Sequence, residues 1–129
     1  MATYLLDTSV IIDAINDKKG RRQLLRDLIE QGNTLGCCPI NITEVYTGLR
    51  PNEEQATRRF LQSLNLYPLT FSVAELAGLL KRDYGKKGQT LNLGDVLIAA
   101  TALQNGLPLL TDNTKDFPMK DLVLYPLPN

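Results

Sequence analysis

Short apolar runs alternate along this chain with longer segments in which hydrophobic residues recur at helical spacing. The first run, residues 3–6, predicts a short strand that stops at Asp7. The hydrophobic residues that follow are spaced as in a helix, and we expect Thr8 or Ser9 to cap its first turn. Gly20 is expected to break this helix.

The alternation of strand-like and helix-like segments continues to the C-terminus. The other predicted strands are residues 35–38, 65–69, 107–111 and 122–125. The other predicted helices follow Gly20, open at Asn41, start at Asn52, and cover residues 72–84 and 93–105. The second helix is expected to end at Gly32 and the third at Pro51, and residues 85–88 are predicted to be a mobile loop.

This order of elements predicts an α/β fold. Strands that alternate with helices form a parallel sheet covered on both faces. We therefore expect a three-layer sandwich with a five-stranded, mainly parallel sheet between helices. In such folds the functional crevice lies beyond the carboxyl ends of the strands, which indicates where candidate functional residues should be sought.

The composition fits one soluble domain spanning residues 1–129. Hydrophobic residues make up 43% and charged residues 22% of the 129 positions, and a chain of this length buries a core without metal or disulfide cross-links. The net charge is zero, which argues against a binder that relies on bulk positive charge. The chain contains no His, which excludes Ser-His-Asp catalysis, ribonuclease chemistry based on a His pair, and zinc sites that contain His.

The two cysteines, Cys37 and Cys38, are adjacent, so we expect buried free thiols rather than a zinc site or a disulfide. Free thiols favour a reducing compartment. The N-terminus lacks the basic segment typical of a signal peptide, and the longest apolar run, residues 96–100, is too short to cross a bilayer. We therefore expect a cytoplasmic protein with no membrane contact.

Acidic and amide side chains stand where predicted strands end and where helices begin. Asp7 follows the first strand, the pair Asp112 and Asn113 follows the fourth, and Glu44 and Asp95 each lie about one turn into a helix. Carboxylates gathered in one crevice repel one another, and a divalent cation relieves that repulsion. Oxygen ligands select Mg²⁺ or Mn²⁺, and such a site supports hydrolysis of phosphodiesters without a histidine.

Each of these acids also has a purely structural interpretation. The pairs Asn41/Glu44 and Asn92/Asp95 are spaced as capping boxes at helix starts. In the structural interpretation, Asp7 only ends the first strand and starts a turn. The pair after the fourth strand is typical of an Asx turn.

Four segments carry a pattern found in a known family: YLLDTS at residues 4–9, ITEV at 42–45, GDVLIAATA at 94–102 and LTDNTKDF at 110–117. In this order and spacing they resemble the PIN domain, and more narrowly the VapC-type toxins of bacterial and archaeal toxin–antitoxin pairs. The resemblance covers nearly the whole chain. It implies a five-stranded parallel sheet between helices and an endoribonuclease activity that depends on Mg²⁺ or Mn²⁺. It also implies a homodimer, and inhibition by a cognate VapB-type antitoxin protein whose tail occupies the cleft.

The resemblance also assigns functional residues. The metal-binding and catalytic acids of the family carry over to Asp7, Glu44 and Asp95. At the fourth position the family has Thr, any residue, then Asp or Asn, which aligns with Asn113 and leaves Asp112 in the variable place. Asp116 is acidic in many relatives, so all three remain candidates for the fourth site residue. The hydroxyls expected to support the acids or to contact substrate belong to Thr8, Ser9 and Thr111.

Basic residues form three clusters, at residues 18–22, 58–59 and 81–87. The first two are typical of solvated helix faces. The third lies close before Asp95 in the sequence. We expect Lys86 and Lys87 to contact RNA phosphates and Tyr84 to stack on a base, the alternative being a solvated loop tip.

The leading hypothesis is therefore a metal-dependent ribonuclease toxin. The main alternative is an inactive PIN-like module that only binds RNA or protein, and retention of the acids argues against it. A signalling receiver domain usually has paired acids after its first strand, which this chain lacks. A haloacid-dehalogenase-like phosphatase needs a second Asp two residues after Asp7, where Ser9 stands.

Overall fold

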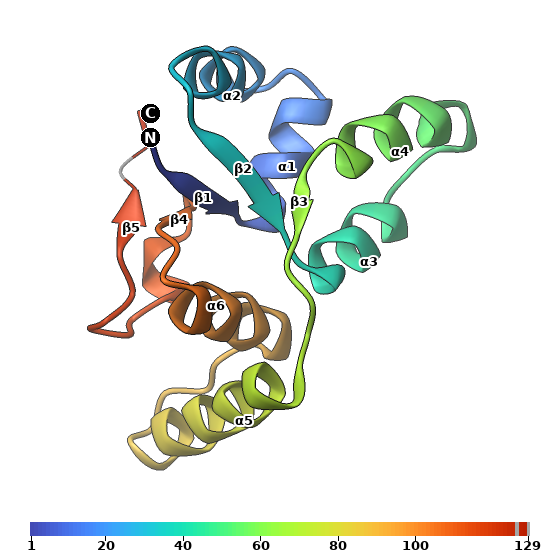
Figure 1. The fold of residues 1–129 in the computed structure, drawn as a ribbon. Helices are drawn as coiled ribbons and strands as arrows, with labels where there is room; N and C mark the ends of the chain where they lie inside the picture. Colours follow the sequence, from blue (N-terminus) through green and yellow to red (C-terminus); the bar gives the residue numbers. More distant parts are fainter. Residues whose placement is uncertain (126, 129) are drawn as a thin grey trace.

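One parallel sheet organises the fold. The computed structural model describes residues 1–125, 127 and 128. Its strands have the order β3-β2-β1-β4-β5, and every neighbouring pair is parallel (Figure 1). The strands are β1 (Thr3–Leu6), β2 (Thr34–Cys37), β3 (Asn65–Leu66), β4 (Leu109–Leu110) and β5 (Leu124–Tyr125). The α-helices are α1 (Thr8–Ile15), α2 (Arg21–Glu30), α3 (Pro39–Thr47), α4 (Glu54–Gln62), α5 (Phe71–Lys86) and α6 (Leu93–Asn105). The 3₁₀-helices are η1 (Pro51–Glu53) and η2 (Thr114–Asp116).

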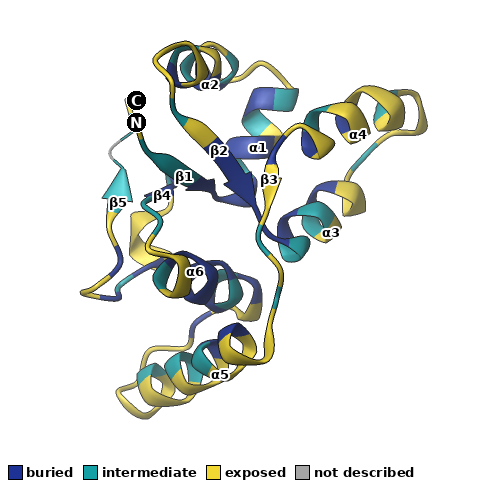
Figure 2. Cartoon of the chain, in the orientation of Figure 1, coloured by how far each residue is buried: buried dark blue, intermediate teal, exposed yellow. Residues whose placement is uncertain are grey.

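Helices cover both faces of the sheet, because neighbouring residues of a strand point to opposite faces. Leu5 of β1 packs into a core formed mainly with α5 and α6. Leu6 packs on the other face, with residues of α1, α2, α3 and α4. Figure 1 shows these two helical layers, and Figure 2 shows buried residues on the sheet and on the helix surfaces that face it. The predicted three-layer α/β sandwich is confirmed.

The central strand β1 is the point where the sheet extends in two directions. Strands β2 and β3 lie on one side of β1, and β4 and β5 lie on the other. In parallel sheets, ligands bind beyond the carboxyl ends of the strands at such a point. Leu6 pairs with Leu110, and the backbone N–H of Asp7 donates to the carbonyl of Leu110. Asp7 and Thr111 therefore leave the sheet side by side.

Helix α6 is buried on nearly every side. Its bounds agree with the prediction, and Val96 and Ile98 are 0% and 1% exposed. Burial on all sides is expected for a helix without a polar face. Gly106 follows in the left-handed conformation, with φ of 63°, and ends the helix.

Several element boundaries differ from the prediction. Helix α1 ends at Ile15, and Gly20 precedes α2 in a left-handed conformation instead of breaking the first helix. Helix α3 starts at Pro39 rather than Asn41, because proline is favoured in a first helical turn. Pro51 starts η1 rather than ending α3. Strands β3, β4 and β5 are shorter than predicted, because only two residues of each pair with a neighbour.

Both cysteines are buried free thiols, as predicted. Cys37 and Cys38 belong to the cores on opposite faces of the sheet. Burial raises the pKa of Cys37 to about 11, so this thiol stays protonated at neutral pH. Among the described residues, no helix is both long enough and apolar enough to cross a membrane.

Leu110→Ala is expected to lower the free energy of unfolding by about 3 kcal/mol, because Leu110 is fully buried and its truncation leaves a cavity. Urea denaturation followed by circular dichroism measures the change. Leu66→Ala is the matched control, since Leu66 is a strand leucine that is 56% exposed, and its effect should stay below about 1 kcal/mol. Equal losses in the two variants would contradict the buried position of Leu110.

Candidate metal-binding active site

Asp7 directly follows β1, at the carboxyl ends of β1 and β4 where the functional crevice of a parallel sheet is expected, and is 4% exposed. Its Oδ2 accepts hydrogen bonds from the hydroxyls of Thr111 (2.6 Å) and Ser9 (3.3 Å). Its Oδ1 accepts a hydrogen bond from the backbone N–H of Thr8 (2.8 Å). Asp7 is therefore the N-cap of α1, and the prediction that Thr8 or Ser9 caps this helix is wrong. The Asp7 carboxylate therefore follows β1, caps α1 and binds Thr111 at the end of the neighbouring strand β4.

Glu44 is held by a chain of hydrogen bonds that begins at a buried asparagine. The hydroxyl of Thr8 donates to Glu44 Oε1 (2.6 Å) and accepts from Asn41 Nδ2 (3.0 Å). Asn41 is 0% exposed, and its Oδ1 accepts from the backbone N–H of Cys38 (2.8 Å). The predicted capping box between Asn41 and Glu44 is therefore wrong, because Asn41 forms its box with Cys38 at the start of α3. Glu44 instead accepts the hydrogen bond from the Thr8 hydroxyl.

The start of α6 brings Asp95 close to the other acids. Asn92 caps α6 by accepting a hydrogen bond from the backbone N–H of Gly94 (2.9 Å). A Cβ atom at Gly94 would lie 2.7 Å from Glu44 Oε2, so a larger residue at this position would displace the carboxylate. Because the cap is provided by Asn92, Asp95 stands in the first turn of α6 as a half-buried acid next to Glu44.

The acids influence one another's ionisation. Burial, together with the charges of Asp7, Asp116 and Glu44, raises the pKa of Asp95 to about 6. Burial also raises the pKa of Asp7; hydrogen bonds to its carboxylate lower this pKa in part, and the charge of Glu44 adds to the rise. Asp116 in η2 thus belongs to the same electrostatic group as the three acids that the family pattern assigns.

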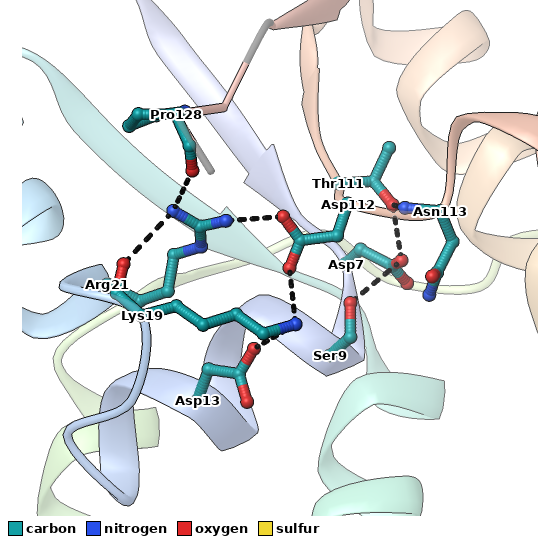
Figure 3. Close-up of polar contacts among 9 residues, drawn as sticks. All are labelled: Asp7, Ser9, Asp13, Lys19, Arg21, Thr111, Asp112, Asn113 and Pro128. Atoms are coloured by element: carbon teal, nitrogen blue, oxygen red, sulfur yellow. Dashed lines mark hydrogen bonds and ion pairs between the residues drawn. The ribbon is translucent and has the colours of Figure 1, made fainter.

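Of the three candidates for the fourth position, Asp112 points its carboxylate toward Arg21 and Lys19 (Figure 3). Its Oδ1 accepts a hydrogen bond from Arg21 Nη2 (2.5 Å), and Lys19 Nζ lies 3.9 Å from its Oδ2. Asn113 lies on the side of Asp7 and Thr111 in Figure 3, and its backbone N–H donates to Thr111 Oγ1 (2.9 Å). The turn predicted as an Asx turn is therefore closed by the threonine hydroxyl.

The donor atoms of this crevice suit a hard divalent cation. The acidic side chains offer only oxygen, and oxygen ligands select Mg²⁺ or Mn²⁺. Within the part of the chain that the structure describes, no three acidic or cysteine side chains lie together as a group that could hold a metal ion. Mg²⁺ suits such an open arrangement, because it is commonly bound by one or two carboxylates while it keeps several waters. The acids that the family pattern assigns to this region are Asp7, Glu44 and Asp95.

The lysine-rich segment differs from the predicted mobile loop. Helix α5 runs to Lys86, so Lys86 lies on its last turn and Lys87 follows it. Lys87 Nζ lies 5.4 Å from the centre of the Tyr84 ring, and the Tyr84 hydroxyl donates to the carbonyl of Pro118 (3.3 Å). Tyr84 also packs against the core. The exposed lysines therefore stand near the segment that carries Asp116, while Tyr84 is engaged with the protein.

Asn41, Gly94 and Arg21 have roles that were not predicted from the sequence. Asn41 orients a hydroxyl of the site, Gly94 makes room for Glu44, and Arg21 binds Asp112. For Gly94 a signal exists, because a glycine beside an acid in a first helical turn indicates a close approach. For Arg21 the sequence carries no such signal, because its partner Asp112 lies 91 positions away in the chain.

The fold and the acidic crevice define this protein as a PIN domain. The sequence profile of the PIN domain family matches residues 4–121. The chain therefore belongs to the PIN domain family, as the resemblance predicted.

Particular relatives narrow the assignment within this family. Ribonuclease VapC10 of Mycobacterium tuberculosis is 33% identical, and the match covers 89% of this chain and 86% of the relative. Ribonuclease VapC19 of the same organism is 30% identical, with coverage of 89% and 92%. The solved structure of VapBC2 from Rickettsia felis bound to a DNA fragment from the promoter has a TM-score of 0.80 at 25% identity. That match covers 95% of this chain and 97% of the other. The predicted similarity to VapC-type proteins is confirmed.

Asp95→Asn is expected to stabilise the metal-free protein at neutral pH, because it removes a carboxylate whose pKa is raised to about 6 in the folded state. The folded state then binds this proton more tightly than the unfolded state does. The bound proton therefore stabilises the folded state fully below pH 3.8, the pKa of Asp95 in the unfolded chain. This stabilisation is lost as the pH rises through about 6. After solvent screening, we expect the wild type to lose about 1 kcal/mol relative to the variant between acidic and neutral pH.

Thermal melts in EDTA across this pH range measure the difference. The control is Asp121→Asn, because Asp121 is exposed and is not among the charges that raise the pKa of Asp95. A lower melting midpoint for Asp95→Asn than for the wild type at neutral pH would contradict the prediction. It would mean that attraction of this acid to the N-terminus of α6 exceeds repulsion by its neighbours.

Proposed function

We propose that this chain is an endoribonuclease that depends on Mg²⁺ or Mn²⁺ and acts as the toxin of a VapBC-type toxin–antitoxin pair. The observation that carries this proposal is the acidic crevice, in which neighbouring charges contribute to raising the pKa of Asp95 to about 6. Crowded oxygen ligands without a histidine suit metal-assisted hydrolysis of phosphodiesters. The similarity to ribonucleases VapC10 and VapC19 supports RNA as the substrate.

The residues of the crevice divide into ligands and groups that orient them. The proposed ligands are Asp7, Asp95 and Glu44. When bound, Mg²⁺ or Mn²⁺ polarises a phosphoryl oxygen and lowers the pKa of the attacking water. Thr111 and Ser9 donate hydrogen bonds to Asp7, and Thr8 donates to Glu44, so these hydroxyls hold the carboxylates in position.

Two residues near the end of β4 complete the proposed site. Asn113 lies on the side of Asp7 and Thr111 (Figure 3), and the charge of Asp116 contributes to the raised pKa of Asp95. Asp112 is paired with Arg21, and we assign it no contact with the metal. In this proposal Asn113 adds an uncharged oxygen donor, and Asp116 adds a carboxylate.

The proposal includes an RNA substrate and two kinds of protein contact. A VapB-type antitoxin is the proposed inhibitor, and the chain is proposed to form a homodimer. The structural match to VapBC2 of Rickettsia felis, over 95% of this chain, supports the antitoxin partner. The proposed compartment is the cytoplasm, a reducing environment that suits the buried free thiols.

Asp7→Asn and Asp95→Asn are each expected to lower kcat for cleavage of single-stranded RNA by about a hundredfold or more. Each removes a negatively charged ligand, and several kcal/mol of metal-dependent stabilisation of the transition state depend on those ligands. EDTA should abolish the wild-type activity, and Mn²⁺ should restore it. Cleavage of a labelled oligonucleotide by protein of verified fold measures kcat.

The matched control for the aspartate variants is Asp121→Asn, which removes a carboxylate from an exposed position and should keep the wild-type rate. Near wild-type turnover in either crevice variant would contradict the assigned ligands. A wild-type protein that binds RNA but cleaves none in Mg²⁺ or Mn²⁺ would instead identify an inactive PIN-like binding module.

We also propose that Lys86 and Lys87 contact RNA phosphates at the rim of the crevice, where both are exposed. Replacing both with Ala should make the log–log salt dependence of RNA binding shallower by about 1.5, since each single-strand phosphate contact contributes about 0.7. RNA affinity over a salt series, with Ca²⁺ in place of Mg²⁺ to limit cleavage, measures the slope. The control replaces the exposed pair Arg58 and Arg59 of α4. An unchanged slope in the lysine variant would identify a solvated helix end.

A further inference from the structure

Arg21 is a buried arginine next to the acidic crevice. It is the first residue of α2 and is 2% exposed, whereas arginines are rarely buried without partners. Its Nη2 donates to Asp112 Oδ1 (2.5 Å), and its Nη1 donates to the carbonyls of Pro128 (2.8 Å) and Lys19 (3.3 Å). The guanidinium thus connects three segments that lie far apart in the sequence, as Figure 3 shows.

The partner of Arg21 lies between two residues that belong to the crevice. Thr111 donates its hydroxyl to Asp7 (2.6 Å), and Asn113 donates its backbone N–H to Thr111 Oγ1 (2.9 Å). Asp112 is anchored from the other side by Arg21. The contacts of residues 111–113 therefore determine how the chain leaves β4. Among the contacts of the described residues, Arg21 is the only positively charged side chain within hydrogen-bond distance of these three residues.

The turn before α2 is shaped to present Arg21 to this segment. Asp17 and Lys19 have positive φ angles of 53° and 56°, which are uncommon for residues other than glycine. Gly20 follows with φ of 70°. This backbone turns the Lys19 carbonyl to the guanidinium, where it accepts a hydrogen bond. Such conformations persist where the surrounding contacts hold them, and the hydrogen bond from Arg21 to the Lys19 carbonyl is one of these contacts.

We propose that Arg21 is a positioning residue of the acidic crevice: by holding Asp112, it keeps the Thr111 hydroxyl on Asp7 and Asn113 on the side of Asp7. This inference rests on the proposed ribonuclease function for its kinetic consequence. Its structural consequence, the geometry of residues 111–113, does not depend on that function.

Asp112→Ala and Asp112→Asn form the matched pair that tests this role. Asparagine keeps an oxygen that accepts the hydrogen bond from Arg21, and alanine does not. We expect Asp112→Ala to lower kcat about tenfold or more with little change in KM, and Asp112→Asn to stay within about threefold of the wild type. Both variants are compared as folded protein, well below their melting temperatures. Equal kcat values for the two variants would overturn the proposal.

A measurement without RNA or metal separates this proposal from the proposed function. Hydrogen exchange of the Asn113 backbone N–H, followed by NMR, reports whether that N–H remains bonded to Thr111. We expect exchange about tenfold faster in Asp112→Ala than in Asp112→Asn. If the wild type cleaves no RNA, the ribonuclease assignment fails, but this comparison still decides the role of Arg21. Equal exchange in the two variants would overturn that role even in an active enzyme.

Arg21→Met tests the same contact from the other partner. It should reduce kcat at least as much as Asp112→Ala does, and the double variant should lose no more than Arg21→Met alone, because the pair acts as one unit. Losses that multiply in the double variant would overturn the proposal. Should Arg21→Met fail to fold, the comparison of alanine with asparagine at position 112 decides by itself.

Discussion

A carboxylate buried at the end of the central strand is the constraint on which the rest of this structure depends. A buried charge requires hydrogen bonds or a counterion. Asp7 obtains its hydrogen bonds from the first residues of α1 and from Thr111 at the end of β4. The register of the sheet, which pairs Leu6 with Leu110, places that threonine beside it. The pairing of β1 with β4 therefore builds the sheet and the site at once.

Neutral hydrogen-bond donors orient the clustered acids and do not neutralise their charge. Among the ion pairs of the described residues, none involves Asp7, Glu44 or Asp95. Hydroxyl and backbone N–H groups hold Asp7, and a hydroxyl holds Glu44. Repulsion between the acids therefore persists in the metal-free protein, at a cost in stability, and it favours a cation that enters the crevice. Asp112 shows the opposite arrangement, because Arg21 compensates its charge beside the same strand end.

Local patterns predicted the elements best where one hydrophobic signal dominates. Helix α6 has the predicted bounds, because its apolar run is enclosed between a capping asparagine and a glycine. The start of α3 was missed, because Asn41 is spaced for two different capping boxes and only one of them forms. The C-terminal end of α5 was missed for a related reason. Gly85 and the two lysines after it resemble a loop, but Gly85 and Lys86 extend a helix that already packs against α6.

The sequence by itself determined the order of strands and helices and the presence of acids at strand ends, because hydrophobic spacing and the change from apolar to polar residues are local properties. It did not determine which of residues 111–113 faces the crevice, because all three are polar and adjacent. That choice depends on partners distant in the chain, such as Arg21, which is 91 positions from Asp112. In the same way, Asn41 supports Glu44 through Thr8, 33 positions earlier. Only the tertiary structure brings such partners within hydrogen-bond distance, and so it decided which polar residues support the crevice.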